Sequence, residues 1–514
     1  GGGLGRNRYT RDGVKKRSSN PSNEDFGDSS SSKQEELYPL PPLTVPNGPR
    51  PSYFTCRHNY ENTLIDEIER YTRIISGDGK VVKASSPYPG LVRVEDDNKD
   101  AALPTLYDPV YALQTMPECV VVTAESIKGI AREVIAALLG NNESNNGDDG
   151  DSTVSIVDEK SKALRKKIRT APRGSLTIHP LVPGMCKGQS NPLRLHRSVK
   201  IGEEISKMLK KSYPAARKAP QQQQLNNNND DDDDDNNNNG NSTLPKEQWV
   251  LQMMLQSPNI AVACLTQCHH VGPGNNAYWP NALHPLGLAK VDIIEKMPSS
   301  AYRKLMEGIE CMGVRPSSPS STTTSSSSSS LTTVVDLGAC PGGWTAVVRR
   351  CFDDSRVIAV DRTAVDSSLM KDEMVDFVKG DAFAFEPPEH TLAGGGGGIS
   401  SSSSNNNNND LWMISDVIAY PERATELLSK WCEMKWASHM IVTMKFQGKE
   451  PDLEELDKAI DVVRNLGYDC RVKHFFNNKN EVTFMVSEKK MVTGKERNND
   501  LEAGIVGTSM FSTL

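Results

Sequence analysis

The chain has 514 residues, 36% of them hydrophobic, and a formal net charge of −7. This length suits two or three domains, although several low-complexity stretches make the folded part smaller than the length suggests. No apolar run is long enough to span a bilayer, so the sequence excludes a transmembrane protein. The ten cysteines form no Cys-x-x-Cys pair, which indicates reduced thiols and not a disulfide framework.

We therefore expect an intracellular protein, most simply a cytoplasmic one, with an organelle or the nucleus left open. The chain begins with Gly1 and not with Met, so a leader or transit peptide could have preceded it. The sequence is nearly silent on oligomeric state, and we expect a monomer that does not bind a membrane.

Composition divides the chain into four parts. Residues 1–50 are rich in Ser, Asn, Pro and Gly and are predicted to be disordered, and residues 491–514 form a polar tail. Between them we expect an N-terminal α+β region at 51–270 and a second domain at 271–490. Low-complexity inserts cannot bury a core and fall between predicted elements, where added length costs little: 221–243, 317–330 and 394–409.

Apolar periodicity predicts the elements of the N-terminal region in chain order. A first small α+β module contains strands at 53–56, 91–94 and 119–123 and helices at 62–75 and 127–139. A polar linker follows, and then helices at 161–169 and 199–213 and strands at 175–182, 249–255 and 260–265. A short turn separates the last two strands, which are predicted to form a hairpin.

The second half of this region is strongly basic. From Lys160 to Lys218 there are sixteen Lys and Arg residues and only two acids. Such a segment suits a polyanionic partner, but a solvated basic face on an ordinary domain explains the charge equally well. Nearby, Cys264, Cys268, His269 and His270 stand close together without a second ligand pair at finger spacing, so we predict no metal site.

The second domain alternates strands and helices. Helices are predicted at 300–312, 345–351, 423–435 and 452–466, and strands at 334–337, 356–361, 375–378, 411–416, 439–445, 470–475 and 481–486. This alternation argues for an open, mainly parallel α/β sheet that ends in a hairpin, which is a Rossmann-like layout.

A glycine-rich turn follows the first strand of this domain, in the run Val334-Val335-Asp336-Leu337-Gly338-Ala339-Cys340-Pro341-Gly342-Gly343-Trp344-Thr345. Later strands end in acids, namely Asp361, Asp381 and Asp416. Ligands of an open α/β sheet bind beyond the carboxyl ends of its strands, where such carboxylates can accept hydrogen bonds from ribose hydroxyls and an adenine amino group. The turn could be purely structural, as in any α/β domain, but the acids favour an adenosine-bearing cofactor.

The turn lacks the features of a phosphate-binding loop. No Lys-Ser or Lys-Thr pair follows it, and a full Gly-x-Gly-x-x-Gly fingerprint is missing. A cofactor without a pyrophosphate fits best, which favours S-adenosylmethionine over NAD. The expected binding residues are those of the turn and of the strand ends: Gly338, Cys340, Pro341, Gly342, Gly343, Trp344, Asp361, Asp381 and Asp416.

A lysine ends the strand that follows. Lys445 comes after six mostly apolar residues, so we expect it at the same edge as Asp416, facing the reacting group. A lysine acts as a general base only if its pKa falls towards neutrality, which a second ammonium and burial can achieve. Lys304 is the candidate for that second ammonium, and Asp416 would orient Lys445. Glu481 is a fourth candidate, and a solvated surface charge is the alternative for either lysine taken alone.

The strand that ends at Asp416 discriminates between reactions. Enzymes that methylate exocyclic amines usually need an Asp/Asn-Pro-Pro-aromatic turn there, whereas this chain has Asp416-Val417-Ile418-Ala419-Tyr420-Pro421. Pyrimidine C5 methylation needs a cysteine nucleophile, and none stands at this turn. An oxygen acceptor activated by a lysine remains.

Four separated motifs between about residues 280 and 490 resemble those of the FtsJ-type RNA ribose 2′-O-methyltransferases. The run 336–344 looks like the adenosylmethionine loop of that family, and 301–307 resembles its Lys-Leu-x-Glu helix. The order of its Lys-Asp-Lys-Glu tetrad is matched by Lys304, Asp416, Lys445 and Glu481. A closer likeness is to the RlmM-type enzymes, which methylate a cytidine ribose in large-subunit ribosomal RNA, and it is carried by Val360-Asp361 with Ser368-Leu369-Met370, by 431–436 and by 279–289.

The resemblance implies a Rossmann-like, S-adenosylmethionine-dependent methyltransferase domain preceded by a small α+β, THUMP-like RNA-binding region. It also implies in-line methyl transfer to a ribose 2′-oxygen, with Lys445 taking the hydroxyl proton. Lys304 and Asp416 would tune and orient that lysine, and Glu481 would support Lys304 or position the ribose. The expected partner is large-subunit ribosomal RNA or its precursor. The alternatives are a transfer-RNA or messenger-cap 2′-O-methyltransferase, which would share the tetrad, and a catalytically silent RNA-binding protein of the same fold.

Overall fold

The computed structural model describes the following residues, all within the unit Leu40–Leu514: 50–76, 81–95, 103, 107–140, 159–183, 192–218, 247–270, 278–279, 281, 284–289, 291–314, 316, 332–352, 355–392, 411–448 and 450–489. The three low-complexity inserts, the polar tail and the predicted disordered segment up to residue 49 lie outside them. Within the described ranges, every helix is too short or too polar to cross a membrane.

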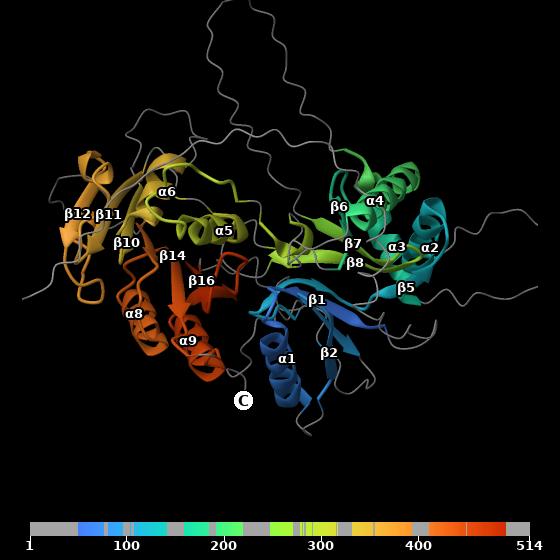
Figure 1. Cartoon of the computed structure of the whole chain (residues 1–514), viewed down its shortest axis with the longest axis horizontal. Helices are drawn as coiled ribbons and strands as arrows, with labels where there is room; N and C mark the ends of the chain where they lie inside the picture. The colour runs from blue at the N-terminus through green and yellow to red at the C-terminus, as the bar shows by residue number, and fades with distance from the viewer. Residues whose placement is uncertain are drawn as a thin grey trace, which may run out of the picture. The chain divides into compact units, whose positions relative to one another are not determined.

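A seven-stranded sheet forms the centre of the second domain (Figure 1). Its order is β12-β11-β10-β13-β14-β16-β15, in which β10 to β14 run parallel and β16 is antiparallel to both of its neighbours. The predicted open, mainly parallel sheet with a final hairpin is confirmed. Its strands are β10 (Thr332–Leu337), β11 (Ser355–Asp361), β12 (Val375–Lys379), β13 (Leu411–Ser415), β14 (His439–Lys445), β15 (Tyr468–Lys473) and β16 (Glu481–Glu488).

Helices cover both faces of this sheet, because successive side chains of its strands point to opposite sides. Val334 of β10 packs in one cluster with α5 and α6, whereas the next residue, Val335, packs in another with α8 and α9. Burial on both sides explains why the central strands are almost continuously apolar. The helices of this domain are α5 (Tyr302–Met312), α6 (Gly343–Cys351), the short α7 (Glu389–Leu392), α8 (Pro421–Glu433) and α9 (Leu453–Asn465).

The N-terminal region begins with a four-stranded antiparallel sheet of order β2-β3-β1-β4, which we call the first sheet. Helix α1 (Glu61–Ser76) packs on it through Leu64 and Ile68. The prediction missed two strands, because β2 is mostly exposed and polar and β4 lacks β-branched residues other than Thr115. The strands are β1 (Ser52–Cys56), β2 (Lys83–Tyr88), β3 (Leu91–Glu95) and β4 (Ala112–Met116).

A second sheet, of order β5-β8-β7-β6, follows, and β9 pairs with β8. The predicted hairpin is confirmed as the antiparallel pair β7–β8. The expectation that strand 119–123 belongs with strand 53–56 in one module is wrong, since Val120 pairs with Ala263 of β8. Alternation identifies a strand but not its partner. The strands are β5 (Val120–Thr123), β6 (Leu176–Leu181), β7 (Gln248–Ser257), β8 (Ile260–His270) and β9 (Tyr278–Trp279).

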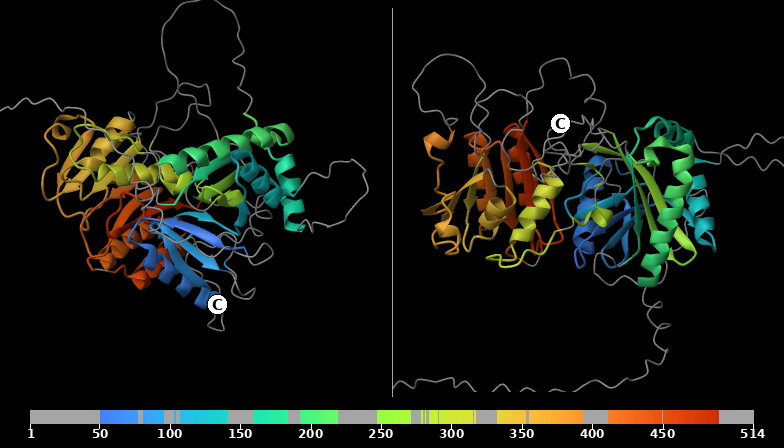
Figure 2. Two further views of the ribbon diagram at one scale, coloured as in Figure 1. Left: turned by 45° about the vertical axis from the view of Figure 1, so that its right-hand side comes forward. Right: turned by 90° about the horizontal axis from the view of Figure 1, so that it is seen from above.

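Helices α2 and α4 pack on the second sheet and α3 packs on α2; α4 runs along β6 and β7 (Figure 2). Helix α2 begins where Ser126 accepts a hydrogen bond from the Gly129 amide, an N-cap that satisfies one orphan donor of its first turn. The helices are α2 (Ile127–Leu139), α3 (Glu159–Thr170) and α4 (Pro192–Ser212), and short 3₁₀ turns lie at Pro214–Ala216, Pro285–Gly287 and Leu369–Lys371.

Candidate active site

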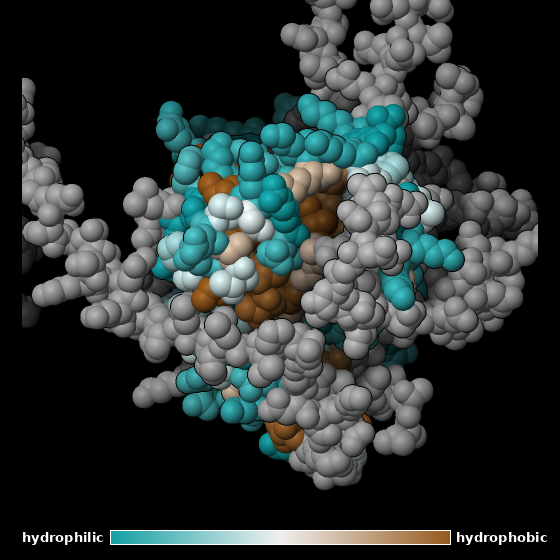
Figure 3. All heavy atoms as spheres, turned by 90° about the vertical axis from the view of Figure 1, so that its right-hand side faces the viewer, coloured by the Kyte–Doolittle hydropathy of each residue, from teal (hydrophilic) through white to brown (hydrophobic). Residues whose placement is uncertain are grey.

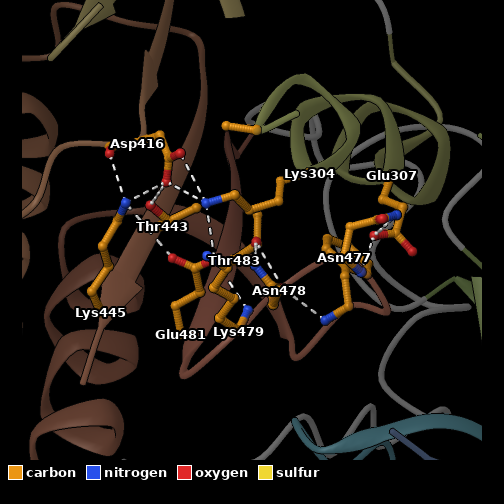
Figure 4. Close-up of polar contacts among 12 residues, drawn as sticks. Lys304, Glu307, Asp416, Thr443, Lys445, Asn477, Asn478, Lys479, Glu481 and Thr483 are labelled. Carbon is orange, nitrogen blue, oxygen red and sulfur yellow. Dashed lines mark hydrogen bonds and ion pairs between the residues drawn. The ribbon is translucent and has the colours of Figure 1, made fainter. Parts of the chain in front are cut away.

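The four tetrad residues come together at the carboxyl edge of the parallel strands (Figure 4). Asp416 follows β13, and Lys445 is the last residue of the neighbouring β14. Glu481 is the first residue of β16 and stands directly opposite Lys445 in the antiparallel ladder. Lys304 reaches the same place from the first turn of α5. The sequence-based grouping of these residues therefore corresponds to one cluster in space.

Two ammonium groups alternate with two carboxylates in this cluster. Lys304 Nζ lies 2.8 Å from both Asp416 carboxylate oxygens and 2.9 Å from Glu481 Oε1. Lys445 Nζ lies 2.8 Å from Asp416 Oδ1, 2.9 Å from the Asp416 carbonyl oxygen and 3.7 Å from Glu481 Oε2. The formal charges balance, and each lysine contacts both acids.

The cluster is largely screened from water. Side-chain exposure is 10% for Lys304, 15% for Asp416, 18% for Lys445 and 6% for Glu481. Burial acts to lower the pKa of Lys304, but Asp416 and Glu481 outweigh it, so the Lys304 pKa is raised. Burial likewise acts to raise the pKa of Asp416, but Lys445 and Lys304 outweigh it, so that pKa is lowered. Lys304 and Asp416 thus remain a charged pair at neutral pH.

Thr443 is a member of the cluster that sequence reasoning missed. Its buried hydroxyl donates to Asp416 Oδ1 at 2.7 Å, the same oxygen that Lys445 contacts. Thr443 precedes Lys445 by two residues on β14, and side chains two apart on a strand point to the same face. The sequence could therefore have identified Thr443 from its spacing of two residues from Lys445.

The glycine turn after β10 has a backbone that only glycine adopts easily at two positions. Gly338 has φ +80°, and a Cβ built on it would lie 2.9 Å from the Val417 Cβ. Gly342 has φ +108°, and a Cβ there would lie 2.4 Å from Leu369 Cδ1. Both positive φ values lie in the region that L side chains rarely enter. The turn also contains a cis peptide bond before Pro341.

The acid at the end of β11 lies beside this turn, and Asp381 follows the neighbouring strand β12. Asp361 Oδ2 accepts a hydrogen bond from the Cys340 amide at 3.1 Å, so the β11 carboxylate fastens the turn. Asp381 accepts from the Phe383 amide and pairs with Arg362, and these two contacts lower its pKa. A carboxylate offers about four acceptor sites, so both acids retain capacity for further donors such as ribose hydroxyls.

Trp344, which is predicted to contact the cofactor, has a buried side chain. Its ring is 3% exposed and packs in the cluster of α5 and α6, and its indole N–H donates to the Ala301 carbonyl at 3.0 Å. The side chain therefore joins the starts of these two helices, and a contact of Trp344 with the cofactor stays a prediction.

Asp336, on β10, is a second residue that the site prediction left out. It is 1% exposed, and its Oδ2 accepts a hydrogen bond from the Thr345 hydroxyl at 2.6 Å. Burial raises the pKa of Asp336 to about 7. This contact joins the strand before the glycine turn to the helix after it, and so fixes both ends of the turn.

Residues 298–418 match the FtsJ-like methyltransferase family. The matched segment contains Lys304, the glycine turn and Asp416, and Lys445 and Glu481 follow it in the chain. The matched segment and the cluster of lysines and carboxylates thus belong to the same domain.

Among curated proteins, Ribosomal RNA large subunit methyltransferase M of Pseudoalteromonas atlantica is 30% identical over 211 residues, which is 40% of this chain and 51% of that protein. The protein of the same name from Mannheimia succiniciproducens is 29% identical over 236 residues, or 43% and 55%. The chain thus spans about half the length of the curated relatives it matches. A solved Methanococcus jannaschii fibrillarin pre-rRNA processing protein covers 31% of this chain and 67% of its own, at 16% identity and a TM-score of 0.22, a likeness too weak to support a conclusion.

The predicted resemblance is confirmed by these relatives and by the family match. The chain contains an FtsJ-like methyltransferase domain and is similar to the RlmM-type ribosomal RNA methyltransferases.

Proposed function

We propose that this protein transfers a methyl group from S-adenosylmethionine to a ribose 2′-hydroxyl of RNA, and that large-subunit ribosomal RNA is its substrate. The observation that carries the proposal is the buried cluster of Lys304, Asp416, Lys445 and Glu481 at the carboxyl edge of the sheet. The names of the curated relatives support the choice of RNA.

The residues of the glycine turn and of the neighbouring strand ends fit an adenosine-bearing cofactor. Gly338 and Gly342 allow the positive φ values of the turn, with Val417 and Leu369 packed against it, and Asp361 and Asp381 offer acceptors for the hydroxyl and amino groups of an adenosine. We assign these four residues to the cofactor. S-adenosylmethionine supplies a methyl group on a positively charged sulfonium.

In this mechanism Lys445 takes the proton of the 2′-hydroxyl onto its Nζ atom. Its ammonium group must first lose a proton to solvent, and Lys445 is the most exposed of the four side chains. Asp416 orients it through two contacts, at Oδ1 and at the carbonyl oxygen. Lys304 and Thr443 in turn fix the Asp416 carboxylate, and holding the groups in line supplies much of the rate.

Exposed apolar side chains next to the cluster suit an RNA nucleotide. Ile418 and Tyr420, in the loop that follows Asp416, are 82% and 61% exposed, and Phe476, in the loop before Glu481, is 43% exposed. Proteins that recognise unpaired RNA stack bases on such side chains. The acceptor ribose would then belong to a nucleotide whose base is held at this rim.

We assign the N-terminal region, residues 51–270, to RNA binding and expect it to be THUMP-like. The basic helices α3 and α4 support this role, since they expose eight lysines to solvent: Lys160, Lys162, Lys166, Lys167, Lys200, Lys207, Lys210 and Lys211. A groove of about 650 Å³ beside α4 is lined in part by Lys207 and Lys210. The face of the molecule that carries these helices is hydrophilic along its upper part in Figure 3, and hydrophobic side chains gather below.

The test is methyl transfer by the purified full chain. The protein is incubated with methyl-tritiated S-adenosylmethionine and, in separate reactions, with large-subunit ribosomal RNA, transfer RNA or capped messenger RNA. The product is digested to nucleosides. We expect label in 2′-O-methylated nucleosides of the ribosomal RNA. Label on a base, or no transfer by a protein that binds the cofactor, would contradict the proposal, and label in transfer RNA or cap alone would change the substrate.

A further inference from the structure

The loop between β15 and β16, residues 474–480, leads directly into Glu481 and is held from two sides. On one side Glu307 of α5, which is 1% exposed, accepts hydrogen bonds from the amide and the side chain of Asn477, both at 2.9 Å (Figure 4). Asn478 of the same loop donates from its side-chain amide to the hydroxyl of Thr483 on β16, at 3.1 Å. Helix α5 therefore carries Lys304 and also anchors the loop that delivers Glu481.

The other side of the loop is held by the segment between β1 and α1. The Lys479 carbonyl oxygen accepts a hydrogen bond from the Tyr60 hydroxyl at 2.7 Å and lies 3.5 Å from Arg57 Nη1. His474 Nε2 lies 2.8 Å from the same oxygen. The Lys479 amide donates to Glu481 Oε1 at 3.2 Å. One residue thus connects a tyrosine of the N-terminal region to a carboxylate of the tetrad.

His474 adds further contacts between this loop and the N-terminal region. Its ring lies against both Tyr60 and Tyr111, with ring centroids 4.0 and 5.2 Å away, and its backbone amide donates to the Val110 carbonyl at 2.9 Å. Burial lowers the pKa of His474 to about 4, so the ring is neutral near pH 7 and donates to the Lys479 carbonyl from Nε2.

The strand that enters the loop is also fixed to the same region. Lys473 donates to the carbonyl oxygens of Pro109 and Ala112 at 2.7 and 3.0 Å, and Arg471 pairs with Asp108 at 2.9 Å. Lys473 contacts Asp108 as well. These ions are buried, so removing one partner would destabilise the fold. The Tyr60 hydroxyl is at the surface end of the same interface and can be removed alone.

We propose that Tyr60 is a positioning residue for methyl transfer, which acts through Lys479 to keep the Glu481 carboxylate between Lys304 and Lys445. The proposal rests on the proposed function, because it assigns the effect to the transfer step. It gives the N-terminal region a second role: besides RNA binding, it completes the methyltransferase site.

The variant that tests this is Tyr60→Phe, which keeps the ring against His474 and removes one hydrogen bond. We expect kcat to fall by about threefold to tenfold, the usual effect of one such bond, with KM for RNA and Kd for S-adenosylmethionine unchanged. The matched control is Tyr468→Phe, at the opposite end of β15, where the hydroxyl bonds the Ala437 carbonyl at 3.2 Å. This variant removes the same kind of bond and should leave kcat unchanged.

Coupling to Glu481 gives the second measurement. In a Glu481→Gln background, Tyr60→Phe should cause no further loss of kcat, because the carboxylate that it positions is gone. Three results would overturn the proposal: an equal loss of kcat in both backgrounds, a wild-type kcat for Tyr60→Phe, or a change in KM for RNA alone. As long as the wild-type protein transfers methyl groups, none of these results affects the proposed function. Absence of transfer by the wild type would instead overturn the proposed function.

Discussion

Lys445 and Glu481 are direct partners in the antiparallel ladder of β14 and β16, with Nζ and Oε2 3.7 Å apart. The backbone of the sheet therefore sets the distance between a lysine and an acid that lie far apart in the sequence. Asp416 completes the arrangement at the end of the next strand. Because the parts that meet here belong to rigid strands, we expect single changes in the cluster to alter chemistry without rearranging the sheet.

Replacing Lys445 by Ala should abolish transfer and leave cofactor binding near normal. The proposed base is lost, which costs on the order of 10² to 10⁴ in rate. Lys445 contacts Asp416 and Glu481, whereas the residues assigned to the cofactor are Gly338, Gly342, Asp361 and Asp381. Transfer is measured with labelled S-adenosylmethionine, and binding by calorimetry. Lys458→Ala, which removes an exposed ion pair on α9, is the control. Lost cofactor binding in Lys445→Ala would contradict the assigned role.

Replacing Lys304 by Met should destabilise the protein as well as inactivate it. The change leaves Asp416 and Glu481 as buried carboxylates with one ammonium in place of two, and breaking a buried pair in this way costs about 3–5 kcal/mol. Thermal unfolding measures the loss. The double variant Lys304→Met, Asp416→Asn removes one of the two charges and should recover part of it. A single variant as stable as the wild type would show that the cluster contributes little to folding.

Asp416 and Lys445 could be placed together because each left a local signal in the sequence. Asp416 and Lys445 each follow a run of apolar residues, and parallel strands bring their carboxyl ends to one edge. The hydrogen bond from Tyr60 to the Lys479 carbonyl left no such signal. The two residues are 419 positions apart, and their contact depends on how the N-terminal region packs against the second domain. Contacts of this kind follow from tertiary packing and not from periodicity.

Replacing Gly338 by Ala should weaken cofactor binding. The residue has φ +80°, and the added Cβ would lie within 3.0 Å of Val417 atoms, so the turn must shift. Binding of S-adenosylmethionine is measured by calorimetry, and we expect affinity to fall at least tenfold. Gly380→Ala is the matched control, because nothing lies within 4 Å of its added Cβ. Equal affinities of the two variants would remove Gly338 from the cofactor site.

Replacing Asp336 by Asn should change how stability depends on pH. Burial raises the pKa of Asp336 from an ordinary 3.8 to about 7, so between these values the folded protein holds a proton that the unfolded chain has released. Its contribution to the free energy of unfolding therefore falls as the pH rises from about 4 to 7, by at most about 4 kcal/mol, and is level above. The amide of Asn has no proton to lose and can still accept from Thr345.

Thermal unfolding of the wild type and of Asp336→Asn is measured between pH 4 and 8. Glu67, whose pKa burial also raises to about 7, contributes in the same direction in both proteins, so the difference between wild type and variant isolates Asp336. Asp292→Asn, at an exposed position, is the control and should follow the wild type. Parallel curves for wild type and Asp336→Asn would show that the carboxyl group is ionised throughout.

The second domain was more predictable than the N-terminal region, for a physical reason. Most of its strands are buried on both faces and read as apolar runs between helices, and all seven strands were predicted. In the N-terminal region, β2 is exposed along most of its length and β5 pairs with β8, which lies more than a hundred residues later. Neither an exposed strand nor a distant partner produces a periodic signal.

The most direct test of the central claim is ribose-methylation mapping of total RNA from cells with and without this protein. The absent gene is complemented with the wild type or with Lys445→Ala. We predict that at least one 2′-O-methyl site in large-subunit ribosomal RNA is lost without the protein, returns with the wild type and does not return with the variant. If every 2′-O-methyl site persists without the protein, it is not a ribose methyltransferase.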